Sequence, residues 1–220
     1  MAELIRGLTV QRVRANLAEV RERIAAAASA TGRDGADVEL VVAGKYVAVE
    51  DLAVLGEAGV EVVGENRAQD LQAKVEAYGD RFAWDFIGHL QSRKVKLVAP
   101  LVRLIHSVST DSVLEQLARH AAPELRVLVE VNVAREDGKA GVAPDDLGAF
   151  LKRCPVPVAG LMTMPPRTTD AEDSRRWFAA LRELAERHEL DVLSMGTTQD
   201  YEVAVQEGAT HVRLGTTLFK

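Results

Sequence analysis

Short apolar segments alternate with longer amphipathic segments along most of the chain. We predict strands at residues 38–44, 61–63, 83–87, 104–107, 126–132, 156–161, 191–194 and 211–214. We predict helices between them at residues 49–57, 68–78, 92–99, 111–120, 145–153, 171–186 and 200–206. Strands that alternate with helices at this spacing build parallel sheets from β–α–β units. The number of repeats favours closure into a single (β/α)8 barrel of the TIM type. An open, doubly wound sheet is the alternative, because counting repeats does not prove closure.

A long helix, with apolar residues at helical spacing, is predicted before the first strand, over residues 8–30. The chain reaches Lys220 too soon after the last strand for a full helix there. We therefore expect the segment 1–32 to pack on the barrel, residues 38–219, in place of an eighth helix. No linker-like composition interrupts the chain, so we expect one domain over residues 1–220.

Composition and charge exclude several classes of function. A net charge of -6 argues against a general nucleic-acid binder. A single cysteine, Cys154, rules out an internal disulfide framework and suits a reducing cytoplasm. Residues 1–14 lack an apolar signal core, and no segment is long and apolar enough for a membrane span. The histidines are scattered without acidic or cysteine partners, so we expect no metal site.

The first predicted strand ends on a cation, Lys45. In barrels of this type the carboxyl ends of the strands carry the chemistry. A neutral lysine amine at that position can attack an aldehyde and form a Schiff base. The alternative is a lysine that extends from a strand end to reach the solvent.

The last two predicted strands both end in glycine-containing, hydroxyl-rich turns, at residues 193–198 and 212–217. Turns of this kind at adjacent strand ends often bind phosphate, because glycine lets backbone N–H groups approach the anion. Glycine and threonine also occur in ordinary turns. Arg213 should point opposite to its neighbours along the strand and needs an acceptor. That acceptor is a ligand ring nitrogen, a ligand phosphate or a carboxylate, with an internal salt bridge as the alternative.

Polar residues also follow the second, third and sixth predicted strands. Asn66 and His89 are the candidates after the second and third strands, and Thr163 begins the loop after the sixth. Polar loop residues at this end of a barrel are better functional candidates than core residues. Asn66 and His89 could instead cap the helices that follow them.

Several of these segments together resemble the YggS/PROSC family of pyridoxal phosphate homeostasis proteins. The matching segments are Val41–Lys45, Val63–Asn66, Phe86–Lys94, Val129–Asn132, Gly160–Met162, Leu193–Gly196 and Val212–Thr216. The resemblance implies an alanine-racemase-like, fold-type III barrel that carries pyridoxal 5'-phosphate (PLP) on Lys45. It places Arg213 beside the pyridine nitrogen. It implies phosphate contacts from the turns at Ser194, Gly196, Gly215 and Thr216. The predicted cofactor site consists of these residues with Lys45 and Arg213, and of the loop candidates Asn66 and His89.

The sequence departs from the family pattern around the first strand, in the third strand and after the seventh. Gly44 stands where the family commonly has serine or threonine, and Tyr46 where a small polar residue is usual. Asp85 replaces a common histidine, and the pair 197–198 is Thr-Thr rather than the frequent Met-Ser. These departures affect contacts around the ring rather than the cofactor itself.

The resemblance implies a protein of cofactor homeostasis that holds PLP without strong catalysis. We expect PLP-dependent apoenzymes as its recipients and a monomer or weak dimer as its state. An arginine at the ring nitrogen disfavours the protonated ring and so weakens it as an electron sink. One alternative is a PLP-dependent racemase. Racemases that resemble this barrel carry a second, β-rich domain and use a partner's tyrosine, whereas this chain ends at Lys220 and its three tyrosines lie in the predicted barrel. Another alternative is a Schiff-base aldolase that acts on a sugar phosphate. For such an enzyme we expect a catalytic lysine deeper in the barrel, with acidic residues nearby.

Overall fold

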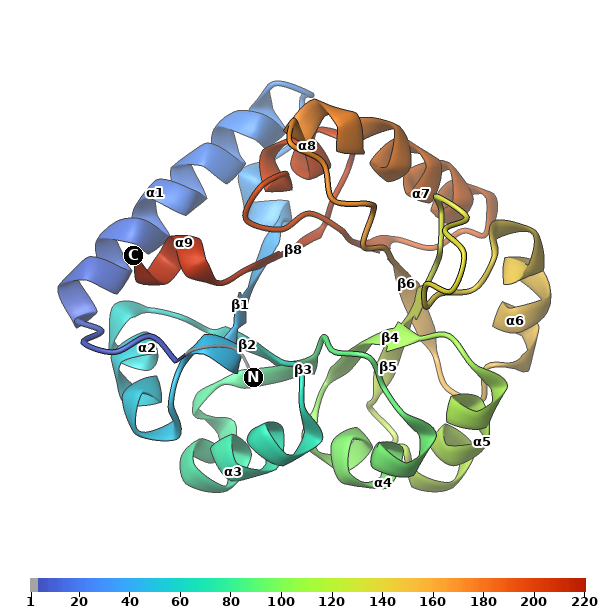
Figure 1. The fold of residues 1–220 in the computed structure, drawn as a ribbon, viewed down its shortest axis with the longest axis horizontal. Helices are drawn as coiled ribbons and strands as arrows, with labels where there is room; N and C mark the ends of the chain where they lie inside the picture. The colour runs from blue at the N-terminus through green and yellow to red at the C-terminus, as the bar shows by residue number, and fades with distance from the viewer. Residues whose placement is uncertain (1–3) are drawn as a thin grey trace.

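Eight parallel strands close into a barrel whose order in space follows the order in sequence (Figure 1). The computed structural model describes residues 4–220. The strands are β1 Glu39–Ala43, β2 Val62–Glu65, β3 Ala83–Phe86, β4 Leu104–Val108, β5 Arg126–Glu130, β6 Val158–Met162, β7 Val192–Ser194 and β8 His211–Leu214. The sheet closes where β1 pairs with β8, with Val41 opposite Arg213. The predicted barrel is confirmed, and the open sheet is excluded.

The helices surround the barrel as an outer ring (Figure 1). They are α1 Val10–Ser29, α2 Leu52–Ala58, α3 Ala68–Tyr78, α4 Val95–Val98, α5 Asp111–His120, α6 Leu147–Arg153, α7 Arg175–Arg187, α8 Tyr201–Gln206 and α9 Thr216–Phe219. The helix predicted over 92–99 is shorter than expected, because α4 is a single turn between 3-10 turns at 92–94 and 99–101. Pro100 is the second residue of the second turn and cannot donate a backbone hydrogen bond to continue the α-helix.

Helix α1 lies against α2, α8 and the short α9 (Figure 1). Thr9 caps its start by accepting from the backbone N–H of Arg12. Its apolar stripe, from Val13 to Ile24, is buried against the barrel. The Asn16 side chain donates to the backbone oxygen of Leu218 in α9, 3.1 Å away. The long first helix therefore stands in the outer ring where a full helix after β8 would otherwise pack. Residues 1–3 of the predicted 1–32 segment lie outside the described residues.

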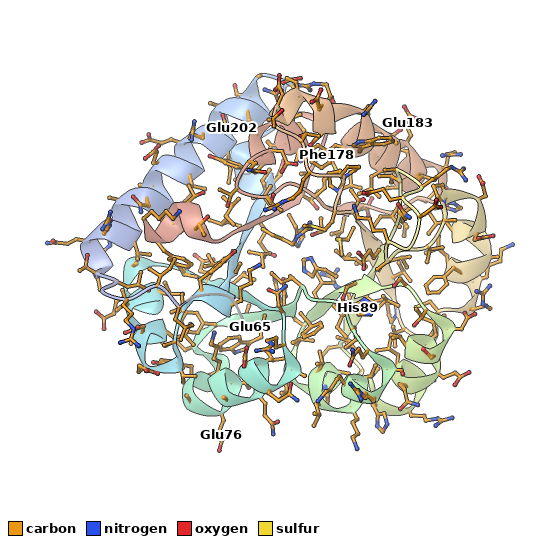
Figure 2. All side chains as sticks on the ribbon, in the orientation of Figure 1. Glu65, Glu76, His89, Phe178, Glu183 and Glu202 are labelled. Carbon is orange, nitrogen blue, oxygen red and sulfur yellow. The ribbon has the colours of Figure 1, made fainter. Side chains whose placement is uncertain are left out.

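The main apolar core lies between the barrel and the helices. Phe178 of α7 is fully buried, whereas Glu76 of α3 projects outward from the ring (Figure 2). In β8, Val212 and Leu214 belong to this core. Arg213, between them, points the opposite way, as the period of a strand requires. The barrel interior thus receives the alternate residues of each strand, several of them polar.

Within residues 4–220, no helix has both the length and the apolar character needed to cross a bilayer.

Candidate functional site

A cleft of ≈ 540 Å³ opens at the carboxyl ends of the strands. Six of the predicted site residues line it: Lys45, Asn66, Gly196, Arg213, Gly215 and Thr216. The loop after β6, residues 164–169, forms part of its wall. A second hollow, of ≈ 480 Å³, lies between α1 and the amino-terminal ends of β1 and β2 and contains none of the predicted residues. The cleft at the carboxyl ends is therefore the candidate site.

Lys45 reaches the cleft from a 3-10 turn, Gly44–Tyr46, that follows β1 directly. Its side chain is half-buried, and its Nζ lies 4.9 Å from the centroid of the Tyr46 ring. That distance is within the range of a cation–π contact, which holds the amine near the cleft without consuming it in an ion pair. The amine is thus placed where a ligand in the cleft can reach it.

A buried ion pair supports the backbone at Lys45. Lys74 of α3 lies 2.5 Å from Oε1 of Glu65 at the end of β2, and it also donates to the Gly44 carbonyl at 2.8 Å. Both side chains are almost fully excluded from solvent. Burial raises the pKa of Glu65, and Lys74 opposes that rise. Figure 2 shows Glu65 inside the ring of helices.

This ion pair explains the glycine at position 44. A Cβ atom built on Gly44 would lie 2.3 Å from Oε1 of Glu65 and 2.9 Å from a methyl group of Val63. A serine or threonine there would collide with the carboxylate unless Glu65 moved. In this chain, Gly44 therefore leaves the room that the Glu65 carboxylate occupies in its bond to Lys74.

Asn66 carries an unsatisfied polar atom beside the cleft. Its Oδ1 is buried and has no hydrogen-bond partner within the described part of the chain. The helix that follows starts with Arg67 at the N-cap position, so Asn66 does not cap α3. A buried acceptor without a partner is costly, and a ligand donor in the cleft would satisfy it.

Arg213 is buried in the barrel and directed at the cleft. Three neutral groups accept hydrogen bonds from its guanidinium: the Ser194 hydroxyl, the Thr163 carbonyl at 3.0 Å and the Met164 sulfur at 2.9 Å. Burial lowers the pKa of Arg213 to about 10, although Glu130 opposes this shift, so the side chain keeps its charge at neutral pH. The internal salt bridge considered from the sequence is not among its contacts in residues 4–220.

The two turns after β7 and β8 meet at the cleft. Gly196 has φ +91, a value that favours glycine, and a Cβ atom there would lie 2.6 Å from Ala204. The backbone N–H of Thr197 is already taken by the Asp200 carboxylate, at 2.8 Å. A Cβ atom on Gly215 would lie 2.7 Å from the Tyr46 ring. Gly215 therefore makes room for Tyr46, another departure from the family pattern.

Two predicted residues lie elsewhere. The Ser194 side chain does not line the cleft, because its hydroxyl is fully buried and bonded to His106 and Arg213. His89 is exposed and does not line the cleft. It also caps no helix, since Gln91 stands at the N-cap position of the following turn. Burial raises the pKa of Glu130, while Arg213 and His89 oppose that rise.

Sequence reasoning missed the residues behind the cleft. Lys74 reads as an ordinary helix residue, and His106 as part of a strand. A charged residue on the inner face of an amphipathic helix was the available signal for Lys74. No sequence signal pairs His106 with Asp85, because they lie on different strands. Lys45, Arg213 and the two glycine-containing turns therefore face a single cleft, whose lining also includes Arg167 and Asp200.

Comparison with known proteins agrees with this geometry. The family model "Alanine racemase, N-terminal domain" matches residues 9–220. A pyridoxal phosphate homeostasis protein of Aquifex aeolicus is 41% identical over 217 residues, covering 92% of this chain and 95% of that protein. One of the same name from Pseudomonas aeruginosa is 38% identical over 214 residues, covering 93% of both. The solved structure of PipY from Synechococcus elongatus PCC7942 with PLP bound has a TM-score of 0.74 and 29% identity, covering 91% of this chain and 100% of that one.

Proposed function

Because this chain belongs to the family of pyridoxal phosphate homeostasis proteins, built on the alanine racemase N-terminal barrel, we propose that it binds PLP in the cleft beside Lys45 and serves the homeostasis of that cofactor. One observation carries the proposal. The Lys45 amine, the Arg213 guanidinium and both glycine-containing turns line the same cleft at the carboxyl ends of the strands. A relative of the same fold, PipY, has been solved with PLP bound.

The side chains present fit PLP. The Lys45 nitrogen can bond to the aldehyde carbon, with the aldehyde oxygen leaving as water, to give a Schiff base. The buried, unpartnered Oδ1 of Asn66 can accept from a polar group of the ligand. We assign the phosphate to the end of the cleft where Gly196, Gly215 and Thr216 lie, because glycine allows close approach of the backbone.

Arg213 sets the electronic character of this site. PLP supplies an electron sink when its ring nitrogen is protonated. A guanidinium has only donors, so a ring nitrogen that faces Arg213 must act as an acceptor and stay unprotonated. We therefore propose a holder of the cofactor with little catalysis of its own. We further propose PLP-dependent apoenzymes as recipients and a monomer or weak dimer as the working state.

Reduction with borohydride tests the covalent proposal. We expect PLP to become fixed to one peptide, and that peptide to contain Lys45. The Lys45→Arg variant should lose the label, whereas Lys94→Arg, a change on the turn before α4, should keep it. A label on Lys74 or Lys94 in the parent protein would contradict the assignment of Lys45.

Two substitutions test the phosphate assignment. Thr216→Val should weaken binding of PLP more than binding of unphosphorylated pyridoxal. Thr217→Val, at the next position, is the matched control. Equal losses for both ligands would show that Thr216 supports the fold rather than the phosphate.

Turnover measurements test the proposed lack of catalysis. We expect negligible racemisation or transamination of common amino acids by the fully loaded protein. A turnover of about 1 per second or faster, typical of dedicated enzymes, would favour the racemase alternative.

A further inference from the structure

A chain of hydrogen bonds runs through the barrel interior and ends on Arg213. Arg103 donates from Nε to Oδ1 of Asp85, at 2.9 Å. The other oxygen of Asp85 lies 3.1 Å from Nε2 of His106. Nδ1 of His106 lies 2.8 Å from the Ser194 hydroxyl, which also accepts from Arg213. Asp85, His106 and Ser194 are fully buried.

The donors and acceptors in this series of hydrogen bonds allow only one placement of the protons. Asp85 is paired with Arg103 and accepts as a carboxylate, so the Nε2–H of His106 donates to it. Burial lowers the pKa of His106 although Asp85 opposes this, so the ring is neutral at pH 7. Its Nδ1 is then an acceptor, and the Ser194 O–H donates to it. The lone pairs of Ser194 are left to accept from Arg213.

Arg103, at the other end of this series of hydrogen bonds, is anchored at the amino-terminal end of the barrel strands. Glu39 accepts from Arg103 at 3.0 Å and lies 3.0 Å from Nε2 of His211. Arg103 is therefore held on both sides, by Asp85 and by Glu39. A fixed Arg103 in turn fixes the carboxylate plane of Asp85.

Asp85, His106 and Ser194 are hydrogen-bonded in the same order as the residues of a Ser-His-Asp catalytic triad. Attack by Ser194 on a substrate does not fit the structure. The hydroxyl is fully buried, lies off the cleft and accepts from Arg213. The residue that donates a hydrogen bond to Ser194 is Arg213, which does line the cleft.

We propose that Asp85 and His106 are positioning residues, which orient Ser194 so that it holds Arg213 at the place of the cofactor's ring nitrogen. The identity of the ligand in this inference rests on the proposed function. The series of hydrogen bonds from Arg103 to Arg213 does not. Without His106, the Ser194 hydroxyl is free to rotate and to compete for other acceptors. Arg213 would then lose its fixed direction while keeping its charge.

The first experiment uses the ligand-free protein, so that its result does not depend on PLP binding. Nitrogen-15 NMR should show His106 as the neutral tautomer with the proton on Nε2. The Nε–H resonance of Arg213 should report an ordered side chain in the parent protein and in His106→Gln, whose amide can both donate and accept. It should report a mobile side chain in His106→Leu and Ser194→Ala. An Arg213 that stays ordered in both of these variants would overturn the proposal.

The second experiment compares PLP with its 1-deaza analogue, which carries C–H in place of the ring nitrogen. His106→Leu and Ser194→Ala should weaken PLP binding about three- to tenfold, the worth of one hydrogen bond. The same variants should leave binding of the analogue nearly unchanged. His106→Gln should restore PLP binding, and His120→Gln, on the surface of α5, is the control. Equal losses for both ligands would reduce His106 to a structural residue.

These experiments distinguish the proposed binding of PLP from the proposed positioning role of Asp85 and His106. If the parent protein fails to bind PLP while the NMR signatures are present, the proposed function fails and the hydrogen-bond chain stands. If PLP binds and is fixed to Lys45 but the analogue loses affinity equally, only the positioning role fails. Labelling of Ser194 by a sulfonyl fluoride would show an accessible nucleophile and would also overturn the positioning role.

Discussion

Removing the amine of Lys74 should destabilise the protein far more than its place on an outer helix suggests. The Lys74 and Glu65 side chains are 4% and 0% exposed, so Lys74→Met leaves a carboxylate buried without its partner. Breaking such a pair from one side costs about 3–5 kcal/mol. The Gly44 carbonyl also loses its donor, and the two costs overlap because one amine serves both acceptors. We therefore expect a loss of about 3–5 kcal/mol in the free energy of unfolding.

Urea denaturation at pH 8 and pH 5 measures this loss and its cause. The pKa of Glu65 is already raised by burial, and removing Lys74 takes away the main group that opposes the rise. The folded variant then favours the protonated carboxyl. A raised folded pKa contributes stability at low pH that is lost as the pH rises through it, so the variant should be weaker at pH 8 than at pH 5.

Lys96→Met, on the exposed face of α4, is the matched control and should change stability by less than about 0.5 kcal/mol. A loss for Lys74→Met no larger than that of this control would show that Glu65 does not depend on Lys74. A loss that is the same at both pH values would show that the cost does not arise from a buried charge.

Three further predictions concern the barrel and its core. Gly160→Ala should cost about 1–3 kcal/mol in urea, because the new Cβ would lie 1.9 Å from the Val192 carbonyl. Phe178→Ala should cost about 3–5 kcal/mol in the same assay, whereas the exposed control Glu183→Ala should stay within about 0.5 kcal/mol. Burial opposes ionisation of Glu39, but hydrogen bonds from a histidine and an arginine lower its pKa from 4.5 to about 2. Its stabilisation is present above pH 4.5 and lost as the pH falls toward 2, so acid titrations of Glu39→Gln should be flatter in that window.

The fold could be predicted from the sequence because its signal is local and repeated. Each buried strand is a short apolar run, and each helix has its own amphipathic period. The expected runs at 83–87 and 211–214 differ from β3 and β8 by at most one residue. The helix expected over 92–99 was wrong in length, because helical spacing of apolar residues continues through the 3-10 turns on either side of α4.

The site could be predicted only in part, because its residues come from different strands. Lys45 and Arg213 each end or occupy a recognisable strand, and both line the cleft. The direction of the Ser194 side chain depends on partners that no local pattern reveals. Its hydroxyl turns inward because His106 and Arg213 both bind it there. His89, in the loop after β3, is exposed and lies outside the cleft.

The turn that carries Lys45 and the side chain of Arg213 are each held from behind by buried polar groups, and this arrangement is not the most stable one available. An ion pair such as Glu65 and Lys74 contributes little stability relative to apolar side chains of similar size. The double variant Glu65→Leu with Lys74→Met should therefore recover most of the stability that Lys74→Met loses. It would still remove the hydrogen bond to the Gly44 carbonyl, which fixes the turn that carries Lys45. We expect this variant to be nearly as stable as the parent protein but to be labelled by PLP and borohydride more slowly. Unchanged labelling would show that the turn at Lys45 is held by its own packing against Tyr46, and that the buried pair serves the fold alone.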